Sequence, residues 1–212
     1  MGAFFSLDSK FMRAMSRIAD LIILNVIYLV TCLPVVTIGA ASTALYTVCF
    51  RLGTAREGGL VKDYFRAFRD EFRQATLIWL FLLLFGAASC VNIFLFLSTG
   101  GWMHYLFFLF VLFLVIVVMM ASYAFPLLSQ FRNDTKSVIK NALIFSVAYL
   151  PRTVLIVVIN VFPWALLLTN LYLFLQTGFA WVFIYFAAAA YINARLLKKA
   201  FAPYMEPEEE EQ

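Results

Sequence analysis

Three long stretches of the sequence contain no charged residue, and they limit the possible folds more than any other feature. They cover residues 21–50, 74–131 and 153–194. A helix needs about 20 apolar residues to cross the hydrocarbon core of a bilayer. The whole chain is 64% hydrophobic and 13% charged, whereas soluble domains carry about 25% charged residues. The sequence therefore predicts an all-α, polytopic transmembrane helical bundle in a cell membrane.

The second and third stretches are each long enough for two spans. We expect the first pair to meet near residues 98–101 and the second pair to turn near residues 176–178, where small and polar residues interrupt the apolar pattern. Residues 1–205 are expected to form a single integral membrane domain. Residues 206–212, EPEEEEQ, form an acidic tail that we expect to be disordered, because it has almost no apolar surface to bury.

The first stretch is too long for one ordinary span and too short for two spans with a long loop. Pro34 lacks a backbone donor and disfavours helical geometry at Leu33. We therefore expect one helix to end at Leu33 and a second to follow residues 37–39. Basic residues precede the stretch, among them Arg17, and others follow it from Arg51 onward.

Lys and Arg accumulate in cytoplasmic loops next to the ends of spans. Basic flanks on both sides of the first stretch thus predict a short hairpin or re-entrant pair that returns to the side from which it entered. About six membrane segments result, with both termini in the cytoplasm and all 16 Lys and Arg on one side. The alternative is five spans, with the N-terminus outside and residues 21–50 crossing once.

Amphipathic stretches near the span ends predict helices that lie along the membrane surface. In residues 60–75, aromatic side chains recur at helical spacing on one face and basic side chains occupy the other; residues 137–151 are similar but more apolar. Such helices are commonly held by the lipid boundary and anionic head groups, and they also suit docking of a partner. The candidate docking residues are Tyr64, Phe65, Arg66, Phe68, Arg69, Phe72, Arg73, Arg132, Lys136 and Lys140.

Motifs of catalysis are absent from the sequence. His104 is the only histidine, the three cysteines lie in separate apolar segments, and there is no GxxxxGK[ST], GxSxG or HExxH pattern. No ionisable residue lies in the middle of a span, although carriers coupled to ions usually place one there. We therefore expect a protein that is not an enzyme, with no metal, no cofactor and no nucleic-acid partner.

Stretches of small residues allow helices to approach closely within a membrane. Residues 40–42, 86–89 and 187–190 are of this kind. They are candidate contacts with another membrane subunit or with a second copy of the chain.

The segment ADLIILNVIYLVTCLPVVTIGAASTALYTV, residues 19–48, resembles the signature of the YesL family of bacterial integral membrane proteins. Residues 123–155, YAFPLLSQFRNDTKSVIKNALIFSVAYLPRTVL, are similar to its second characteristic block, and YFRAFRDEFRQATLIWL lies between them. The residues that carry the resemblance also form the break in the membrane segment: Asp20, Asn25, Leu33, Pro34, Thr37 and Gly39.

The resemblance implies a role in carbohydrate uptake in Gram-positive bacteria, since genes of this family often lie beside those for ATP-binding-cassette (ABC) sugar importers. We expect a non-enzymatic accessory membrane subunit that binds the importer's permease and contributes to its assembly, stability or regulation. One alternative is an autonomous channel or carrier for a small solute. Another is a membrane relay to a two-component sensor.

Overall fold

The computed structural model describes residues 10–52, 59–98, 105–131 and 133–204, and helices dominate them. In chain order the elements are α1 (Lys10–Cys32), η2 (Val35–Thr37), α2 (Ile38–Arg51), α3 (Leu60–Asp70), α4 (Phe72–Ser98), α5 (Leu106–Gln130), α6 (Thr135–Ala148), α7 (Leu150–Thr169), α8 (Leu171–Gln176), α9 (Gly178–Ala180), η4 (Trp181–Tyr185), α10 (Phe186–Phe201) and η5 (Ala202–Tyr204). The predicted tail at residues 206–212, His104 and Arg132 lie outside the described residues.

Five segments of the described chain are long and apolar enough to cross a membrane, which confirms the predicted polytopic helical bundle. They are Ala14–Cys32, Phe72–Ser98, Leu106–Gln130, Leu150–Thr169 and Gly178–Tyr204. A sixth apolar segment, Val35–Arg51, is shorter. The first of the two predicted short segments is thus long enough to span a membrane, and the second is a shorter helix.

The first apolar stretch turns back on itself. α1 ends at Cys32 and α2 begins at Ile38, so the break falls at Leu33 and Pro34 as predicted. Tyr28 lies one turn before the end of α1, and Ser42 lies one turn into α2. Their hydroxyl oxygens are 3.4 Å apart. Arg17 near the start of α1 and Leu52 after α2 line the same cavity. The chain therefore leaves the hairpin at the end of the molecule where it entered.

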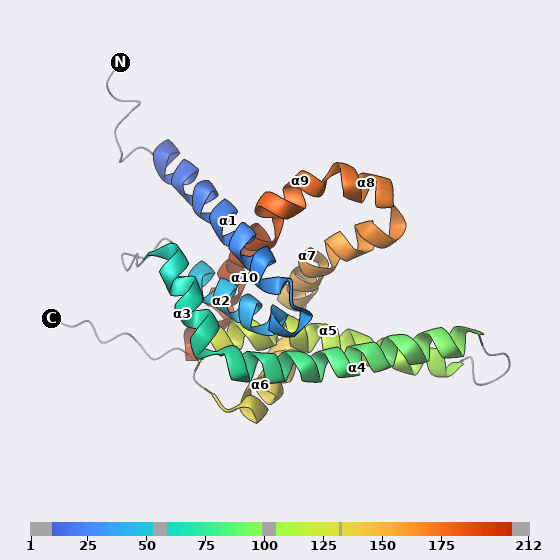
Figure 1. Ribbon diagram of the computed structural model, residues 1–212. Helices are drawn as coiled ribbons and strands as arrows, with labels where there is room; N and C mark the ends of the chain where they lie inside the picture. The colour runs from blue at the N-terminus through green and yellow to red at the C-terminus, as the bar shows by residue number, and fades with distance from the viewer. Residues whose placement is uncertain (1–9, 53–58, 99–104, 132, 205–212) are drawn as a thin grey trace, which may run out of the picture.

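α2 is the centre of the bundle. Between Gly39 and Phe50, every residue of α2 except Ser42 is buried, because α1, α3, α4, α5 and α10 all pack around it. Its first turns are rich in Gly and Ala, which allow neighbouring backbones to approach closely. In Figure 1, α2 lies behind α1 and beside α3, which runs across the bundle rather than along it.

The helix ends that carry the basic residues gather at one end of the molecule, which we call the basic end. Its centre is the buried ring of Phe201 at the end of α10, which packs at 6.2 Å on Phe50 of α2 and at 5.5 Å on Phe131 after α5. Gln74 at the start of α4 donates to the Asn133 carbonyl at 2.6 Å, which joins α4 to the segment between α5 and α6.

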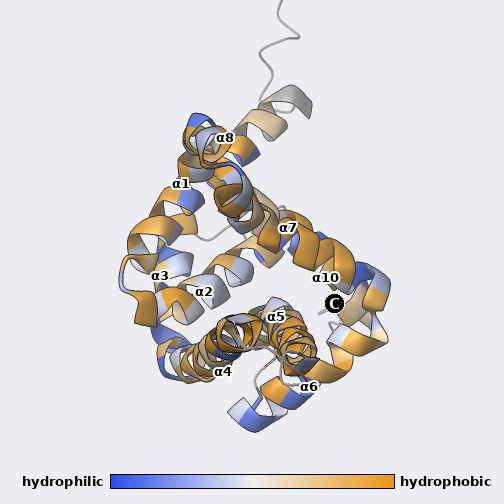
Figure 2. Cartoon of the chain, turned by 90° about the vertical axis from the view of Figure 1, so that its right-hand side faces the viewer, coloured by the Kyte–Doolittle hydropathy of each residue, from blue (hydrophilic) through white to orange (hydrophobic). Residues whose placement is uncertain are grey.

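Away from the basic end, two helical hairpins separate. α4 and α5 pack on each other along their length, while α7 and α8 leave in another direction (Figure 1). Figure 2, seen from the side opposite the basic end, shows α4 and α5 on one side of the molecule and α8 on the other. Their outer surfaces are apolar, and only 11% of the spanning window of α4 is buried within the protein.

The last pair of spans differs from the sequence prediction at its turn. The sequence places one turn near residues 176–178, whereas the helix is interrupted at both Asn170 and Thr177, with α8 between them. Asn170 is the N-cap of α8, where its side-chain oxygen accepts from the Leu173 N–H at 3.1 Å. Asparagine is a favoured N-cap because it satisfies a free helical donor, and this local bond adds the second break.

Candidate functional site

The hairpin between α1 and α2 is held by hydrogen bonds to carbonyls that the helices cannot satisfy. The last carbonyls of a helix have no partner within it, and unpaired polar groups at membrane depth are costly. The Thr37 hydroxyl donates to the carbonyls of Thr31 at 2.5 Å and Pro34 at 2.6 Å. The indole N–H of Trp79, on α4, donates to the Val35 carbonyl at 2.7 Å. These three carbonyls are thus hydrogen-bonded within the protein, although residues 33–36 are exposed.

Gly39 allows α2 to lie directly against α4. A Cβ at this position would lie 2.4 Å from the Ala75 carbonyl oxygen and 2.6 Å from the Cβ of Trp79. Both neighbours belong to, or are attached to, the backbone of α4 and cannot move aside alone. The glycine therefore fixes the spacing of the two helices, and with it the position of Trp79 beneath the turn.

The side chain of Asn25 joins α1 to the π-helix η4. It is completely buried. Its amide nitrogen donates to the carbonyls of Trp181 at 3.0 Å and Val182 at 2.7 Å, and its amide oxygen accepts from the Ala187 N–H at 2.9 Å. A π-helix shifts its hydrogen bonds by one residue, which leaves backbone groups for a side chain to satisfy. Asn25 supplies these bonds and holds the last span against the first.

Asp20 and Leu33 complete the set that carries the YesL resemblance. Asp20 lies half-buried on α1. Leu33 is 79% exposed at the hairpin turn and has no packing role inside the chain. Three of the six residues therefore hold helices together: Asn25 and Thr37 through hydrogen bonds, and Gly39 through close packing. Pro34 ends α1, and Leu33 beside it is exposed.

A second buried polar cluster was only partly predictable. Asn193 of α10 donates to the Tyr46 hydroxyl of α2 at 3.3 Å and to the Asn160 side-chain oxygen of α7 at 2.9 Å. Asn160 was visible in the sequence as a polar residue within a span. Asn193 was missed because it stands in an apolar stretch close to basic residues. Its side-chain oxygen is buried without a partner.

The predicted docking residues on α3 divide into a buried and an exposed part. Tyr64 is completely buried; its hydroxyl lies 2.6 Å from the Thr31 hydroxyl and donates to the Ala41 carbonyl at 3.4 Å. Burial raises the pKa of Tyr64, an effect that the hydrogen bond with Thr31 only partly offsets, so the hydroxyl stays protonated. Tyr64 therefore ties α3 to the α1–α2 hairpin and is not part of the surface.

The exposed part of the set forms a basic surface with one aromatic anchor. Phe65 is 48% exposed. Phe68 is half-buried between the rings of Tyr64, 6.4 Å away, and Phe72, 5.5 Å away. We call the exposed members on α3 and at the start of α4 the α3 face: Phe65, Arg66, Arg69 and Arg73.

The remaining docking candidates lie on α6. Lys136 and Lys140 are exposed there. Asp134 caps this helix by accepting from the Lys136 N–H at 3.4 Å. The opposite side of α6, with Val138, Ala142 and Ser146, is buried, so the two lysines point away from the bundle.

The described part of the chain contains no candidate metal centre. Within it, no group of three or more His, Cys, Asp or Glu side chains is placed to hold a metal ion. The three cysteines are free; Cys49 is buried, Cys32 half-buried and Cys90 exposed.

Comparison with known proteins gives one result, over the region that contains the hairpin. Residues 21–93 match the family model described as "Protein of unknown function, DUF624", the family to which YesL belongs. The match runs from the second half of α1 through α2 and α3 and into α4, and so includes Asn25, Thr37, Gly39 and Trp79. No curated protein and no solved structure matched the chain.

Proposed function

We propose that this chain is a YesL-type accessory subunit of an ABC carbohydrate importer, which binds the permease and contributes to its assembly, stability or regulation. It performs no catalysis itself. Both termini lie in the cytoplasm of a multi-pass protein of the cell membrane, because Lys and Arg favour that side. The basic end then faces the nucleotide-binding side of an importer.

The observation that carries the proposal is the way α3 is held. A helix kept at the surface by lipid places its apolar side in the bilayer. Here the central aromatic residue of that side, Tyr64, is buried in the protein and hydrogen-bonded to the α1–α2 hairpin. The α3 face therefore projects from a rigid base. Fixed arginines next to an exposed aromatic ring are typical of protein interfaces.

A contact within the membrane is also supported. Of the three small-residue stretches, residues 40–42 and 187–190 are used mainly inside the bundle. On α4, in contrast, Ala87 and Ala88 are exposed in the middle of a span. Small exposed residues at that depth give a partner helix close access to the α4 backbone.

The alternative function is an autonomous carrier for a small neutral solute. The specific observation in its favour is the cluster of buried Tyr46 and Asn193 with half-buried Asn160, in which the Asn193 side-chain oxygen has no partner among the described residues. Polar groups inside a bundle commonly mark a pathway. Ion coupling is not expected, since no charged residue lies in residues 21–50, 74–131 or 153–194.

Photo-crosslinking in native membranes separates the two functions. A photoreactive phenylalanine analogue is placed at Phe65, on the α3 face, and in a control protein at Val154, an exposed position on α7. If the accessory proposal is right, the analogue at position 65 forms adducts with importer permease or ATPase subunits. The double substitution Arg66→Gln and Arg69→Gln should reduce the yield of these adducts, whereas the control substitution Lys199→Gln should leave it unchanged. It fails if position 65 gives no such adduct. Solute flux through the purified protein alone in liposomes would favour the carrier.

A further inference from the structure

A cavity of about 210 Å³ lies at the basic end, between the start of α1, the end of α2 and the last turns of α10. It is lined by Arg17, Cys49, Phe50, Leu52, Tyr191, Ala194, Arg195 and Lys198. Pockets that enclose drug-sized ligands have volumes of roughly 300–1,000 Å³. This cavity is smaller and fits a single charged group with a short attached chain.

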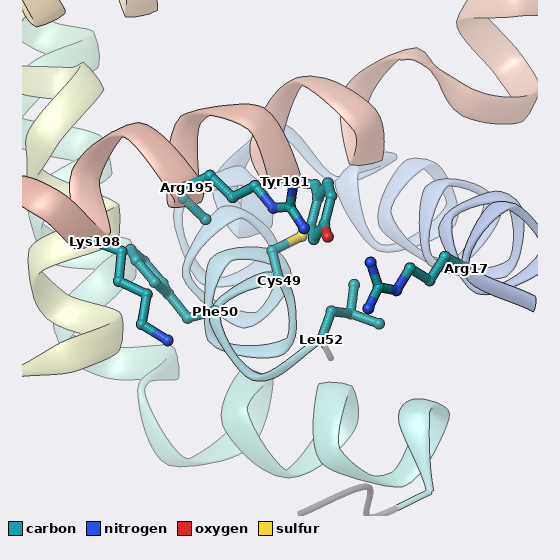
Figure 3. A pocket seen from close by; sticks show the side chains of 8 residues that line it. Arg17, Cys49, Phe50, Leu52, Tyr191, Arg195 and Lys198 are labelled. Atoms are coloured by element: carbon teal, nitrogen blue, oxygen red, sulfur yellow. The ribbon is translucent and has the colours of Figure 1, made fainter. Parts of the chain in front are cut away.

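Three of the eight lining residues are cations, and none of the eight is acidic. Figure 3 shows the Arg17 guanidinium on one side of the lining residues, the Arg195 guanidinium beside the ring of Tyr191, and Lys198 on the opposite side, beside Phe50. The Arg195 Cζ lies 4.7 Å from the centre of that ring. Like charges repel, and an anion between them would relieve this repulsion.

The level of the cavity in the membrane indicates which anion is suitable. Arg17 lies in the first turn of the span Ala14–Cys32, and Lys198 in the last turns of the span Gly178–Tyr204. Both residues stand at the ends of their spans, which is the level of the lipid phosphate groups, and the proposed topology makes this the cytoplasmic leaflet. Basic pockets between spanning helices at this level are suited to lipid head groups, and Phe50 and Leu52 provide an apolar wall.

We propose that this cavity is a binding site for a phosphate group, held by Arg17, Arg195 and Lys198 between α1 and α10. Arginine and lysine both bind phosphate oxygens through charge-assisted hydrogen bonds. The phosphate belongs either to an anionic phospholipid or to a small soluble compound. In both cases it links the first and last spans to the central helix α2, so that binding stabilises the folded bundle. The inference does not depend on the importer partner.

The test measures thermal unfolding of the full chain purified in a zwitterionic detergent. Phosphatidylglycerol, phosphatidylcholine and inorganic phosphate are titrated in separate arms. Wild-type protein is compared with Arg17→Gln combined with Lys198→Gln. The control is Lys136→Gln combined with Lys140→Gln, which removes the same charge from exposed positions on α6. Native mass spectrometry of the same samples counts the phosphatidylglycerol molecules that remain bound.

A ligand that binds only the folded state raises the unfolding temperature in a saturable way. We expect phosphatidylglycerol to stabilise the wild type and the α6 control, with one tightly retained lipid and no comparable effect of phosphatidylcholine. The pocket variant should need about tenfold more lipid, or should not saturate, because it lacks two charge-assisted contacts. If inorganic phosphate gives the saturable effect instead, and the pocket variant loses it, the source is a soluble phosphate compound.

The proposal is overturned if the pocket variant and the α6 control respond equally, or if neither phosphate source gives a saturable shift in the wild type. Should the double variant not elute as a single folded species, Arg17→Gln alone provides the comparison, because Arg17 is exposed and makes no packing contact inside the bundle core. If the Arg17→Gln variant loses the retained lipid and the Arg17→Lys variant keeps it, the site is supported. Unchanged lipid retention in Arg17→Gln contradicts it.

Discussion

Replacing Gly39 with alanine tests the packing of the hairpin more sharply than any other single substitution. The new Cβ would lie 2.4 Å from the Ala75 carbonyl oxygen and 2.6 Å from the Cβ of Trp79. Ordinary contacts begin near 3.4 Å, so α2 and α4 would have to separate by roughly 1 Å. That movement also stretches the hydrogen bond from Trp79 to the Val35 carbonyl, now 2.7 Å.

The expected cost follows from these contacts. Overpacking a well-packed core costs about 1–3 kcal/mol, and losing the hydrogen bond from Trp79 to the Val35 carbonyl adds about 1 kcal/mol. The greater helix propensity of alanine returns up to about 1 kcal/mol. We therefore expect the Gly39→Ala variant to lose about 2 kcal/mol of unfolding free energy.

The assay is reversible unfolding by sodium dodecyl sulfate in mixed micelles, followed by tryptophan fluorescence and far-ultraviolet circular dichroism. Gly86→Ala is the matched control, because Gly86 also lies within a helix but a Cβ there would meet only Val117 Cγ1 at 3.9 Å. We expect this control to lie within about 1 kcal/mol of the parent, on the stabilising side. If the two variants differ by less than about 0.5 kcal/mol, which is the scale of ordinary surface substitutions, the close approach of α2 and α4 is refuted.

Three further substitutions address the hydrogen bonds of the hairpin and its neighbours, using the same unfolding assay. Asn25→Leu should lower the unfolding free energy by about 2 kcal/mol, because it leaves the backbone groups around η4 without partners. The control Asn92→Leu removes only a bond to Ala88 within α4, and it should lower the unfolding free energy by less than about 0.5 kcal/mol. Thr37→Val should cost about 1 kcal/mol, with Thr37→Ser close to the parent, since only the hydroxyl reaches the carbonyls. Tyr64→Phe should cost about 1 kcal/mol and increase proteolysis within α3; an unchanged cleavage rate would contradict the role of Tyr64 in holding that helix.

The sequence predicts those parts of the fold in which one residue, or the absence of charge, determines the local backbone structure. The charge-free stretches define the spans because charge is costly in lipid, and Pro34 ends α1 because it removes a donor and restricts Leu33. The identity of the residue that covers the break was not predictable. Trp79 stands in an apolar stretch of α4, and only the packing of Gly39 on that helix brings its indole to the Val35 carbonyl.

In the candidate site, too, the local helix was predictable from the sequence and its partners in the fold were not. The helical spacing of aromatic and basic residues predicts α3, but the same spacing fits a helix facing lipid and one facing protein. The burial of Tyr64 comes from its partner on α1, Thr31, which lies far away in the sequence. The π-helix was not predictable either, because its cause is the side chain of Asn25 on another span. The phosphate site joins residues from the two ends of the chain.

The account depends most on the basic end facing the cytoplasm, since both the α3 face and the phosphate site require it. Single cysteines at Ser6, Lys136 and Thr177 in a cysteine-free chain, labelled with a membrane-impermeant maleimide on intact cells and after permeabilisation, test this directly. We predict that position 177 reacts on intact cells, and that positions 6 and 136 react only after permeabilisation. Labelling of position 6 on intact cells while position 136 stays protected would mean that residues 21–50 cross once, and labelling of both would place the basic end outside. Either result would contradict the account.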